Sequence, residues 1–387
     1  MEELVGSDLA TPPGASEFEV SVFGPGHGEC IVLHLGKGEW MVVDSHRDAE
    51  TNEPVALRYL QTLGVDVAEQ VKMVVATHWH DDHMDGLGDL FEQCESAKFA
   101  CTMAMQSDEL KTLIETYRGQ ILNVGSGVDE MRQVLDQLAG RVPAGGIAAP
   151  MLTKEREELL SRNGALPFKI RALAPSDAGV AVMLTRIQQK QLPKDNRRRL
   201  RVPVLDKNDA SVVLAVRVGD ASVLLGGDLE ERRRTGLGWQ VILDNFPAEG
   251  DRFDGFKIPH HGSKTGYHPE VWPRLMHGES WAAVTPFNQL EQPLPTRADC
   301  QRILETAKYA YVSATPGLTE YHHDQLGVRE TELAATLAIA EEPGLQGQIR
   351  LRRRVGGNGG DWTVELFGNA VPLAALLGQN PAGGAAA

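Results

Sequence analysis

Short apolar runs separated by glycine-rich turns dominate the beginning of the chain. A run of β-type residues begins at Phe18, within EFEVSVFG. CIVLHLG and WMVVD follow, with turns at Gly24–Gly28 and Gly36–Gly38. Apolar and β-branched runs bounded by glycine are typical of β-strands. The pattern therefore predicts a strand meander that ends at Asp44.

Helical and strand patterns then follow one another. Apolar residues within Pro54–Leu63 have helical spacing, and VKMVVAT is a continuous apolar run, typical of a strand buried on both faces. We expect mainly helices over 87–140, with a short strand near Lys98–Thr102, and a further helix over 152–162.

The remaining pattern again alternates. Phe168–Leu173 predicts a strand, and SVVLAVRVG with ASVLLGGD predicts a hairpin around Gly219–Asp220. WAAVTPFN, Pro295–Ala307 and YAYVSA predict strand, helix and strand, and QIRLRRRV with WTVELFG predicts a second hairpin. Such alternation favours two α/β halves around facing sheets.

Composition suggests the domain boundaries. Residues 1–16 and 371–387 are rich in small residues, and we expect flexible tails there. Residues 17–370 are expected to form a single domain, with a helical insertion at about 87–165 and a polar, basic surface loop at about 186–207.

Charge limits the partners of the whole chain. Its 387 residues are 42% hydrophobic and 24% charged, which is ordinary for a globular protein, and the net charge is -15. Such a chain has no global attraction to nucleic acid or to an anionic membrane. A polyanionic ligand must therefore meet a local basic patch or a bound metal.

Cysteine usage and the N-terminal residues favour the cytoplasm. None of the four cysteines forms a CxxC pair, which argues against a thiolate zinc knuckle and a disulfide scaffold. The N-terminus has no apolar signal region, and no run reaches the roughly 18 apolar residues of a membrane helix. We expect a cytoplasmic protein without a membrane partner.

The strongest chemical signal is HWHDDH, directly after the buried strand. His78 and His80 lie two residues apart, so in an extended segment they point to the same side and can bind one cation. Asp82 and His83 come where the chain turns toward a helix and can face a second cation. Imidazole and carboxylate ligands suit zinc, and also manganese or iron. A polar surface loop is the alternative, and the preceding strand disfavours it.

The motif resembles the HxHxDH signature of the metallo-β-lactamase superfamily. VVDSH, LLGGD and KIPHHGS resemble its other motifs, in the right order over about residues 18–315. The resemblance implies a four-layered αββα sandwich, with Asp44 supporting the metal histidines from behind and Asp228 bridging two metals. It also implies that His261 completes the second metal. His260 is the alternative ligand, and otherwise would touch substrate or carry protons.

The chain departs from many relatives because it has no histidine between His83 and His260. The segment KNDAS stands in that region, and the resemblance implies that Asn208, Asp209 or water replaces the missing ligand, so that one or two ions bind. KNDAS and HHGSKTG resemble the branch with the hydrolase domain of the DNA-importing competence protein and phosphorylcholine-esterase-like enzymes. The segment 288–293 lacks the histidine that this branch often has there.

Other polar residues have a functional and a structural interpretation. His27, on a glycine-rich turn, can reach the site or lie on the surface, and the surface is more common. Ser263 and Lys264 can contact an anionic substrate, or serve as a helix cap and a solvated lysine. The arginines of 197–201 can bind phosphates, although a solvated loop is favoured. We expect His322-His323-Asp324 to be a loop.

These ligands predict hydrolysis by a metal-activated water, with Asp82 or Asp228 orienting the water and accepting its proton. Resemblance to the branch favours a phosphodiester, and the net charge favours a small or single-stranded nucleic acid over a long duplex. A carboxylic ester, thioester or lactam is the second hypothesis. A weakly catalytic regulatory or toxin-like protein is the third, and the sequence identifies no protein partner.

Overall fold

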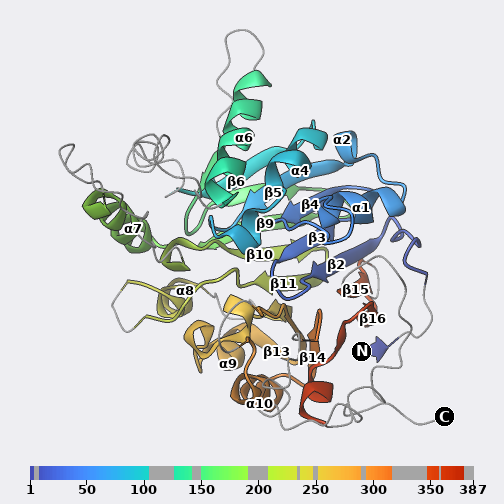
Figure 1. Cartoon of the computed structure of the whole chain (residues 1–387). Coiled ribbons are helices and arrows are strands. Elements are labelled where there is room, and N and C mark those ends of the chain that lie inside the picture. The colour runs from blue at the N-terminus through green and yellow to red at the C-terminus, as the bar shows by residue number, and fades with distance from the viewer. Residues whose placement is uncertain are drawn as a thin grey trace.

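Two β-sheets face each other, and helices cover both outer faces (Figure 1). This computed structural model describes residues 1–3, 8–103, 126–141, 150–190, 208–232, 236–246, 252–288, 293–315, 347–356 and 359–378. The four layers confirm the αββα sandwich expected from the sequence.

The first sheet has nine strands in the order β1-β16-β15-β2-β3-β4-β5-β6-β7. Their bounds are β1 Glu2–Glu3, β2 Glu17–Phe23, β3 Cys30–His34, β4 Trp40–Val43, β5 Val71–Ala76, β6 Lys98–Thr102, β7 Met151–Thr153, β15 Gln348–Arg354 and β16 Thr363–Phe367. The expected meander is β2-β3-β4, and β4, β5 and β6 then pair in parallel. The carboxyl ends of β4 and β5 therefore meet at one edge.

The second sheet has eight strands in the order β17-β14-β13-β12-β11-β10-β9-β8. Their bounds are β8 Glu158–Arg162, β9 Phe168–Ala174, β10 Val213–Val218, β11 Ala221–Leu225, β12 Phe253–Lys257, β13 Met276–Val284, β14 Tyr309–Val312 and β17 Val371–Pro372. β10 and β11 form the expected hairpin, and β11, β12 and β13 are parallel. Their carboxyl ends also share an edge.

The helices form the outer layers. Their bounds are α1 Val55–Thr62, α2 Val67–Gln70, α3 Asp81–Met84, α4 Leu87–Gln93, α6 Ser126–Gly140, α7 Asp177–Lys190, α8 Trp239–Asn245, α9 Val271–Leu275 and α10 Arg297–Thr306. Short 3₁₀ turns are η2 Asn208–Ala210, η3 His260–Gly262, η4 Lys264–Gly266 and η5 Leu373–Leu377. Helices α1, α4 and α6 lie over the first sheet, and α8 to α10 lie over the second (Figure 1).

The hydrophobic core divides into three clusters, one for each interface between layers. The strands explain this division because successive side chains point to opposite faces. In β4, Val42 packs under α1 and α4, whereas Val43 faces the second sheet. In β11, Leu224 packs under α8 to α10, whereas Val223 faces the first sheet. Burial on both faces explains the nearly continuous apolar runs.

The expected helix over 152–162 is wrong. This segment forms β7, a turn with Arg156 in a left-handed conformation (φ 72°), and β8, which pairs antiparallel with β9. Sheet pairing overrides the helical spacing of its apolar residues. The expected insertion at 87–165 therefore contributes strands to both sheets. Helix α7 covers the start of the expected basic loop, and residues 191–207 lie outside the described residues.

Both expected tails are corrected in part. β1 pairs with β16, and the carbonyls of Asp8, Leu9 and Thr11 accept hydrogen bonds from buried or half-buried arginines. Residues 371–377 form β17 and η5, and most of their side chains are buried. These ends are held because they cover polar or apolar surface of the domain. Within the described ranges, none of the helices has both the length and the apolar character needed to cross a bilayer.

Candidate metal centre

The candidate site lies where the carboxyl ends of parallel strands from both sheets meet. Asp44 follows β4, and His78 and His80 follow β5 in an extended segment that leads into α3. Asp228 follows β11, and His261 follows β12. Open α/β sheets commonly place ligand sites at such strand ends.

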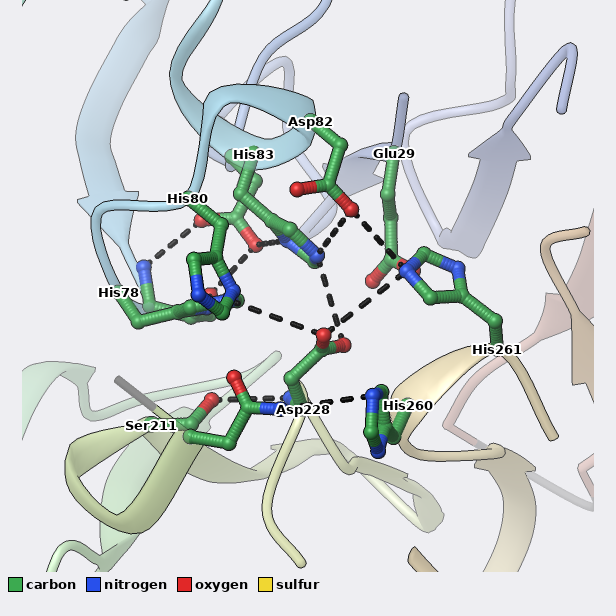
Figure 2. A network of polar contacts seen from close by, with 12 residues as sticks. Glu29, His78, His80, Asp82, His83, Ser211, Asp228, His260 and His261 are labelled. Carbon is green, nitrogen blue, oxygen red and sulfur yellow. Dashed lines mark hydrogen bonds and ion pairs between the residues drawn. The ribbon is translucent and has the colours of Figure 1, made fainter. Parts of the chain in front are cut away.

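Two groups of side chains share Asp228. One group contains Asp82, His83, Asp228 and His261, and the other contains His78, His80 and Asp228; within each, the ligand atoms lie within 4.8 Å of one another. Figure 2 shows the Asp228 carboxylate between the two groups. The geometry is that of a carboxylate able to face two cations at once.

The separations within the groups suit a metal. His83 Nε2 lies 3.4 Å from Asp228 Oδ1, and His261 Nε2 lies 3.1 Å from Asp82 Oδ2 and 3.8 Å from Asp228 Oδ2. His78 Nε2 lies 3.7 Å from Asp228 Oδ2. Ligand atoms around a tetrahedral zinc ion lie roughly 3.4 Å apart. Within each group, the side chains thus converge as ligands of one ion would.

Asp44 and Thr77 orient two of the histidines from behind. Asp44 Oδ2 accepts a hydrogen bond from His83 Nδ1 (2.7 Å) and one from the Thr77 hydroxyl (2.7 Å). Because that hydroxyl donates to the carboxylate, its oxygen accepts from His78 Nδ1 (3.0 Å). Both histidines therefore turn Nε2 toward the site. Sequence reasoning identified Asp44 but not Thr77.

Ser211 and Gly227 hold the loop of Asp228. The Asp228 amide donates to Ser211 Oγ at 2.9 Å. Gly227 has φ 51°, and a Cβ there would lie 2.6 Å from both Ser211 Oγ and the Val212 carbonyl oxygen. Only glycine fits this turn without displacing backbone. The LLGGD motif therefore serves the placement of its aspartate, and the role of Ser211 was not recognised from sequence.

The two histidines of the HHGS motif have different surroundings. Both adopt left-handed backbone conformations, with φ 49° at His260 and 52° at His261, a strained region that recurs at functional sites. His261 is buried, and its Nδ1 donates to the Thr285 carbonyl at 3.2 Å, so that Nε2 faces Asp82. His260 points elsewhere, to Thr265 Oγ1 at 2.8 Å and Glu230 Oε1 at 3.2 Å.

The charges of the site depend on one another. Burial opposes ionisation of Asp228, yet His83 and His261 hold its pKa well below the ordinary value. Burial also opposes protonation of His83, but the Asp228, Asp82 and Asp44 carboxylates raise its pKa. Burial, then His83 and His80, lower the pKa of His78. The carboxylates thus favour a positive charge on His83, at the point where a cation would bind.

Two orphaned atoms test whether a metal fits. His83 Nε2 and Asp228 Oδ1 are buried and make no hydrogen bond within the described part of the protein. A buried polar atom without a partner costs about 1–3 kcal/mol, and a metal bond removes that cost. These atoms face each other, and nitrogen with carboxylate oxygen is a donor set for zinc. The residues therefore fit a metal ion.

The other predicted site residues lie outside the two groups. The carboxylate of Asp209 is held by Arg186 and Arg232, each at 2.6 Å, and Asn208 Nδ2 donates to Glu230 Oε1 at 3.0 Å. The structure therefore does not bring Asp209 to the cluster as a replacement ligand. Asn208 also approaches His260 Nε2, at 3.4 Å.

The three predicted substrate contacts are at or near the surface. His27 is exposed on its turn. Ser263 caps η4 by accepting a hydrogen bond from Thr265 N, and Lys264 is exposed. These positions agree with the structural interpretations, namely a surface histidine, a helix cap and a solvated lysine. Because His27 and Lys264 are exposed, a large substrate could contact both side chains. The segments 197–201 and 322–324 lie outside the described residues.

Solved structures of metallo-β-lactamase fold proteins are similar to this chain, each at a TM-score below 0.5. Similar solved structures include the metallo-β-lactamase fold protein YhfI from Bacillus subtilis, at 13% identity and TM-score 0.34, over 70% of this chain and 86% of that one. Another is Zn(2+)-bound PqqB from Methylobacterium extorquens, at 11% identity and TM-score 0.29, over 59% of each chain.

A third similar structure is LRA-12, a class B3 di-zinc metallo-β-lactamase from an Alaskan soil metagenome, at 12% identity and TM-score 0.27, over 66% of this chain and 82% of that one. No protein-family model matches the sequence, and no curated protein matches it. At such low identities and TM-scores, these likenesses carry no argument about activity. Function must be argued from the site itself.

Proposed function

We propose that this protein is a metal-dependent hydrolase of phosphodiesters, with a nucleotide or a single-stranded nucleic acid as substrate. The observation that carries the proposal is the position of Asp228, whose carboxylate faces a group with His83 and a group with His78. Bound divalent cations supply a water of lowered pKa and neutralise charge on the attacked group. Zinc is the proposed metal, and one or two ions fit the donor set.

The carboxylates have separate roles. The Asp82 side chain is 14% exposed, whereas that of Asp228 is 3% exposed. Asp82 is thus better placed to accept a proton from the attacking water and pass it to solvent. Asp228, which belongs to both groups, is better placed to hold the metal and to orient that water. Asp44 and Thr77 keep the histidine nitrogens aimed at the centre, which limits reorganisation during the reaction.

His260 is the proposed proton carrier for the leaving group. Its side chain is 21% exposed, at the rim of the site, and Glu230 and Thr265 fix its Nδ1 side. A histidine held by a carboxylate in this way is a common general acid. Asn208 Nδ2 lies 3.4 Å from His260 Nε2, and the ring gives up this long contact when Nε2 donates its proton to the leaving group.

Two features support the phosphodiester class. The segments KNDAS and HHGSKTG resemble those of the branch with the hydrolase domain of the DNA-importing competence protein, a resemblance that favours a phosphodiester. Paired metal positions also suit in-line displacement at phosphorus. The net charge of -15 disfavours a long duplex, because neutralisation of many phosphates requires an extended basic surface. A small or single-stranded substrate therefore fits better. A cytoplasmic location is part of the proposal.

Metal content and a substrate panel test the proposal. We expect about two zinc ions per chain by mass spectrometry, falling in Asp228→Ala but unchanged in Asp48→Ala, which removes a buried carboxylate outside both groups. We expect turnover of bis-p-nitrophenyl phosphate or single-stranded DNA, lost in His80→Ala. Turnover of p-nitrophenyl acetate or a lactam, without phosphodiester turnover, would show that the substrate class is wrong.

A further inference from the structure

A buried ion pair joins the two sheets beside the candidate metal centre. Glu29 lies directly before β3 of the first sheet, and Lys257 is the last residue of β12 of the second. Lys257 Nζ contacts Glu29 Oε2, and the two side chains are 0% and 1% exposed. A fully buried pair adds little to stability compared with apolar residues of similar volume. Its place in the core therefore invites a functional explanation.

Thr285 connects this pair to the proposed ligand His261. Its hydroxyl donates to Glu29 Oε2 at 2.5 Å, and its carbonyl accepts from His261 Nδ1 at 3.2 Å. The same hydroxyl oxygen lies 3.4 Å from His261 Nδ1. The direction and tautomer of the His261 ring thus depend on Thr285, and the position of Thr285 depends on Glu29.

Glu29 also contacts the other side of the centre. Its backbone amide donates to the Asp82 carbonyl at 2.8 Å. Figure 2 shows its carboxylate close to His261 and Asp82. The residue therefore borders both Asp82 and His261, which are ligands of the same proposed ion.

The second carboxylate oxygen of Glu29 has no hydrogen-bond partner within the described residues. Oε1 is buried, and a Glu29 oxygen lies within 4.8 Å of donor atoms of Asp44 and His83. This trio does not make a third metal site, because Asp44 is already occupied by His83 and Thr77. The Glu29 carboxylate, this close to Asp44 and His83, instead adds negative potential around the ligands.

We propose that Glu29, fixed by Lys257, is a positioning residue that holds His261 through Thr285 and so sets the affinity of the Asp82–His83–Asp228–His261 metal position. This inference rests on the proposed metal-dependent function, but not on the substrate class. Residues that orient a ligand through its far side commonly change metal affinity by about 10- to 100-fold when removed.

The test measures zinc affinity by competition with a chelator. We expect Glu29→Gln and Thr285→Val each to weaken binding of the second ion by about 10- to 100-fold. The double variant is expected to lose little more than either single variant, because both act on one ring. Thr285→Ser returns the hydroxyl and is expected to rescue the loss. In the cobalt-substituted protein, the visible bands of that position should change in Glu29→Gln.

A matched control separates this role from simple loss of a buried charge. Glu365→Gln removes the carboxylate of another buried pair, with Arg350, in the outer strands of the first sheet. It should lower thermal stability as Glu29→Gln does, with zinc affinity and cobalt bands unchanged. If Glu29→Gln does not fold, Thr285→Val carries the test, since it leaves the ion pair in place.

The outcomes are distinct. Unchanged zinc affinity and cobalt bands in a folded Glu29→Gln or Thr285→Val would overturn the positioning role. Strictly additive losses in the double variant would also overturn it, because independent effects do not pass through one histidine. A wild type that binds metal but cleaves no phosphodiester would contradict only the substrate class, and the affinity measurements would still decide the role of Glu29.

Discussion

The hydroxyl of Thr77 links two supports of the candidate centre. It donates to Asp44 and accepts from His78, so the Asp44 carboxylate acts on His83 directly and on His78 through Thr77. One carboxylate thereby orients a histidine of each group. A small side chain beside the motif carries more of the geometry than its residue type suggests.

Thr77→Val removes this link while keeping the shape of the side chain. We expect zinc affinity at the His78 position to fall by about tenfold or more, because His78 loses the acceptor of its Nδ1–H. Thr102→Val is the control, since Thr102 is also fully buried and its hydroxyl makes no hydrogen bond within the described residues. Equal zinc affinity in the two variants would contradict the role of Thr77.

The sequence could predict the ligand candidates and the supporting residue Asp44, but not the other supports, such as Ser211 and Thr285. His78, His80 and His83 are recognisable from local spacing after an apolar strand. The partners Ser211 and Asp228 are 17 residues apart, and Glu29 and Thr285 are 256 apart. Contacts over such separations follow from sheet order, which no local pattern contains. Motifs therefore indicate the ligands, whereas the fold determines what orients them.

Strand β3 carries a buried histidine, His34, that makes the stability of the protein depend on pH. His34 packs on Trp40, with ring centroids 4.7 Å apart, and its Nε2 accepts from the Gly38 amide at 3.0 Å. Burial lowers the pKa of His34 to about 4 from an ordinary 6.5. The unfolded chain therefore binds this proton more readily than the folded protein.

We expect His34 to destabilise the protein as pH falls. Its contribution is fully present above about pH 6.5 and is lost toward pH 4, by roughly 3 kcal/mol in all. His34→Gln keeps an acceptor for Gly38 but has no titrating ring. Urea unfolding of both proteins at pH 7, 6, 5 and 4 should therefore show a smaller loss in the variant, and parallel curves would contradict the assignment.

Element predictions succeeded where periodicity was supported by turns. The meander from β2 to β4, the β10–β11 hairpin and the strand before the HWHDDH motif are confirmed. The helix expected at 152–162 is wrong because β8 gains its hydrogen bonds from β9, a partner that the segment itself does not reveal. Helix α7 was not predicted.

At the scale of the whole molecule, the N-terminal segment closes one end of the first sheet. Arg350 donates to the carbonyls of Asp8 and Leu9 and pairs with Glu365, and Arg352 donates to the Thr11 carbonyl and pairs with Glu19. Burying a guanidinium cation costs free energy unless hydrogen-bond acceptors surround it, so each of these carbonyls contributes to stability. The segment is therefore part of the domain.

Removal of residues 1–12 should lower the free energy of unfolding by about 3 kcal/mol, because two guanidinium groups lose backbone acceptors. Removal of residues 1–7 keeps the three carbonyls and should cost clearly less. Chemical denaturation of the three proteins measures the difference. Zinc content should be unchanged, since the described residues of this segment, 1–3 and 8–12, belong to neither ligand group. Equal stability of the two truncated proteins would contradict this account.

The layered architecture was predictable because four motifs occur in a fixed order. The N-terminal end of the domain was not, since its small and polar residues show no periodicity, and the buried arginines of β15 reveal why it is held. Sequence composition thus distinguishes core from surface better than it distinguishes free from docked segments.

The two halves of the proposed metal position come from distant parts of the chain, with Asp82 and His261 separated by 179 residues. A nascent chain cannot assemble this position until both sheets have formed and docked, which makes it a late, high-contact-order event in folding. Metal binding would then favour complete folding, because a cation bound between the two sheets stabilises only the completed domain. When refolding is followed with a zinc-sensitive dye, the protein should take up zinc in the slowest phase.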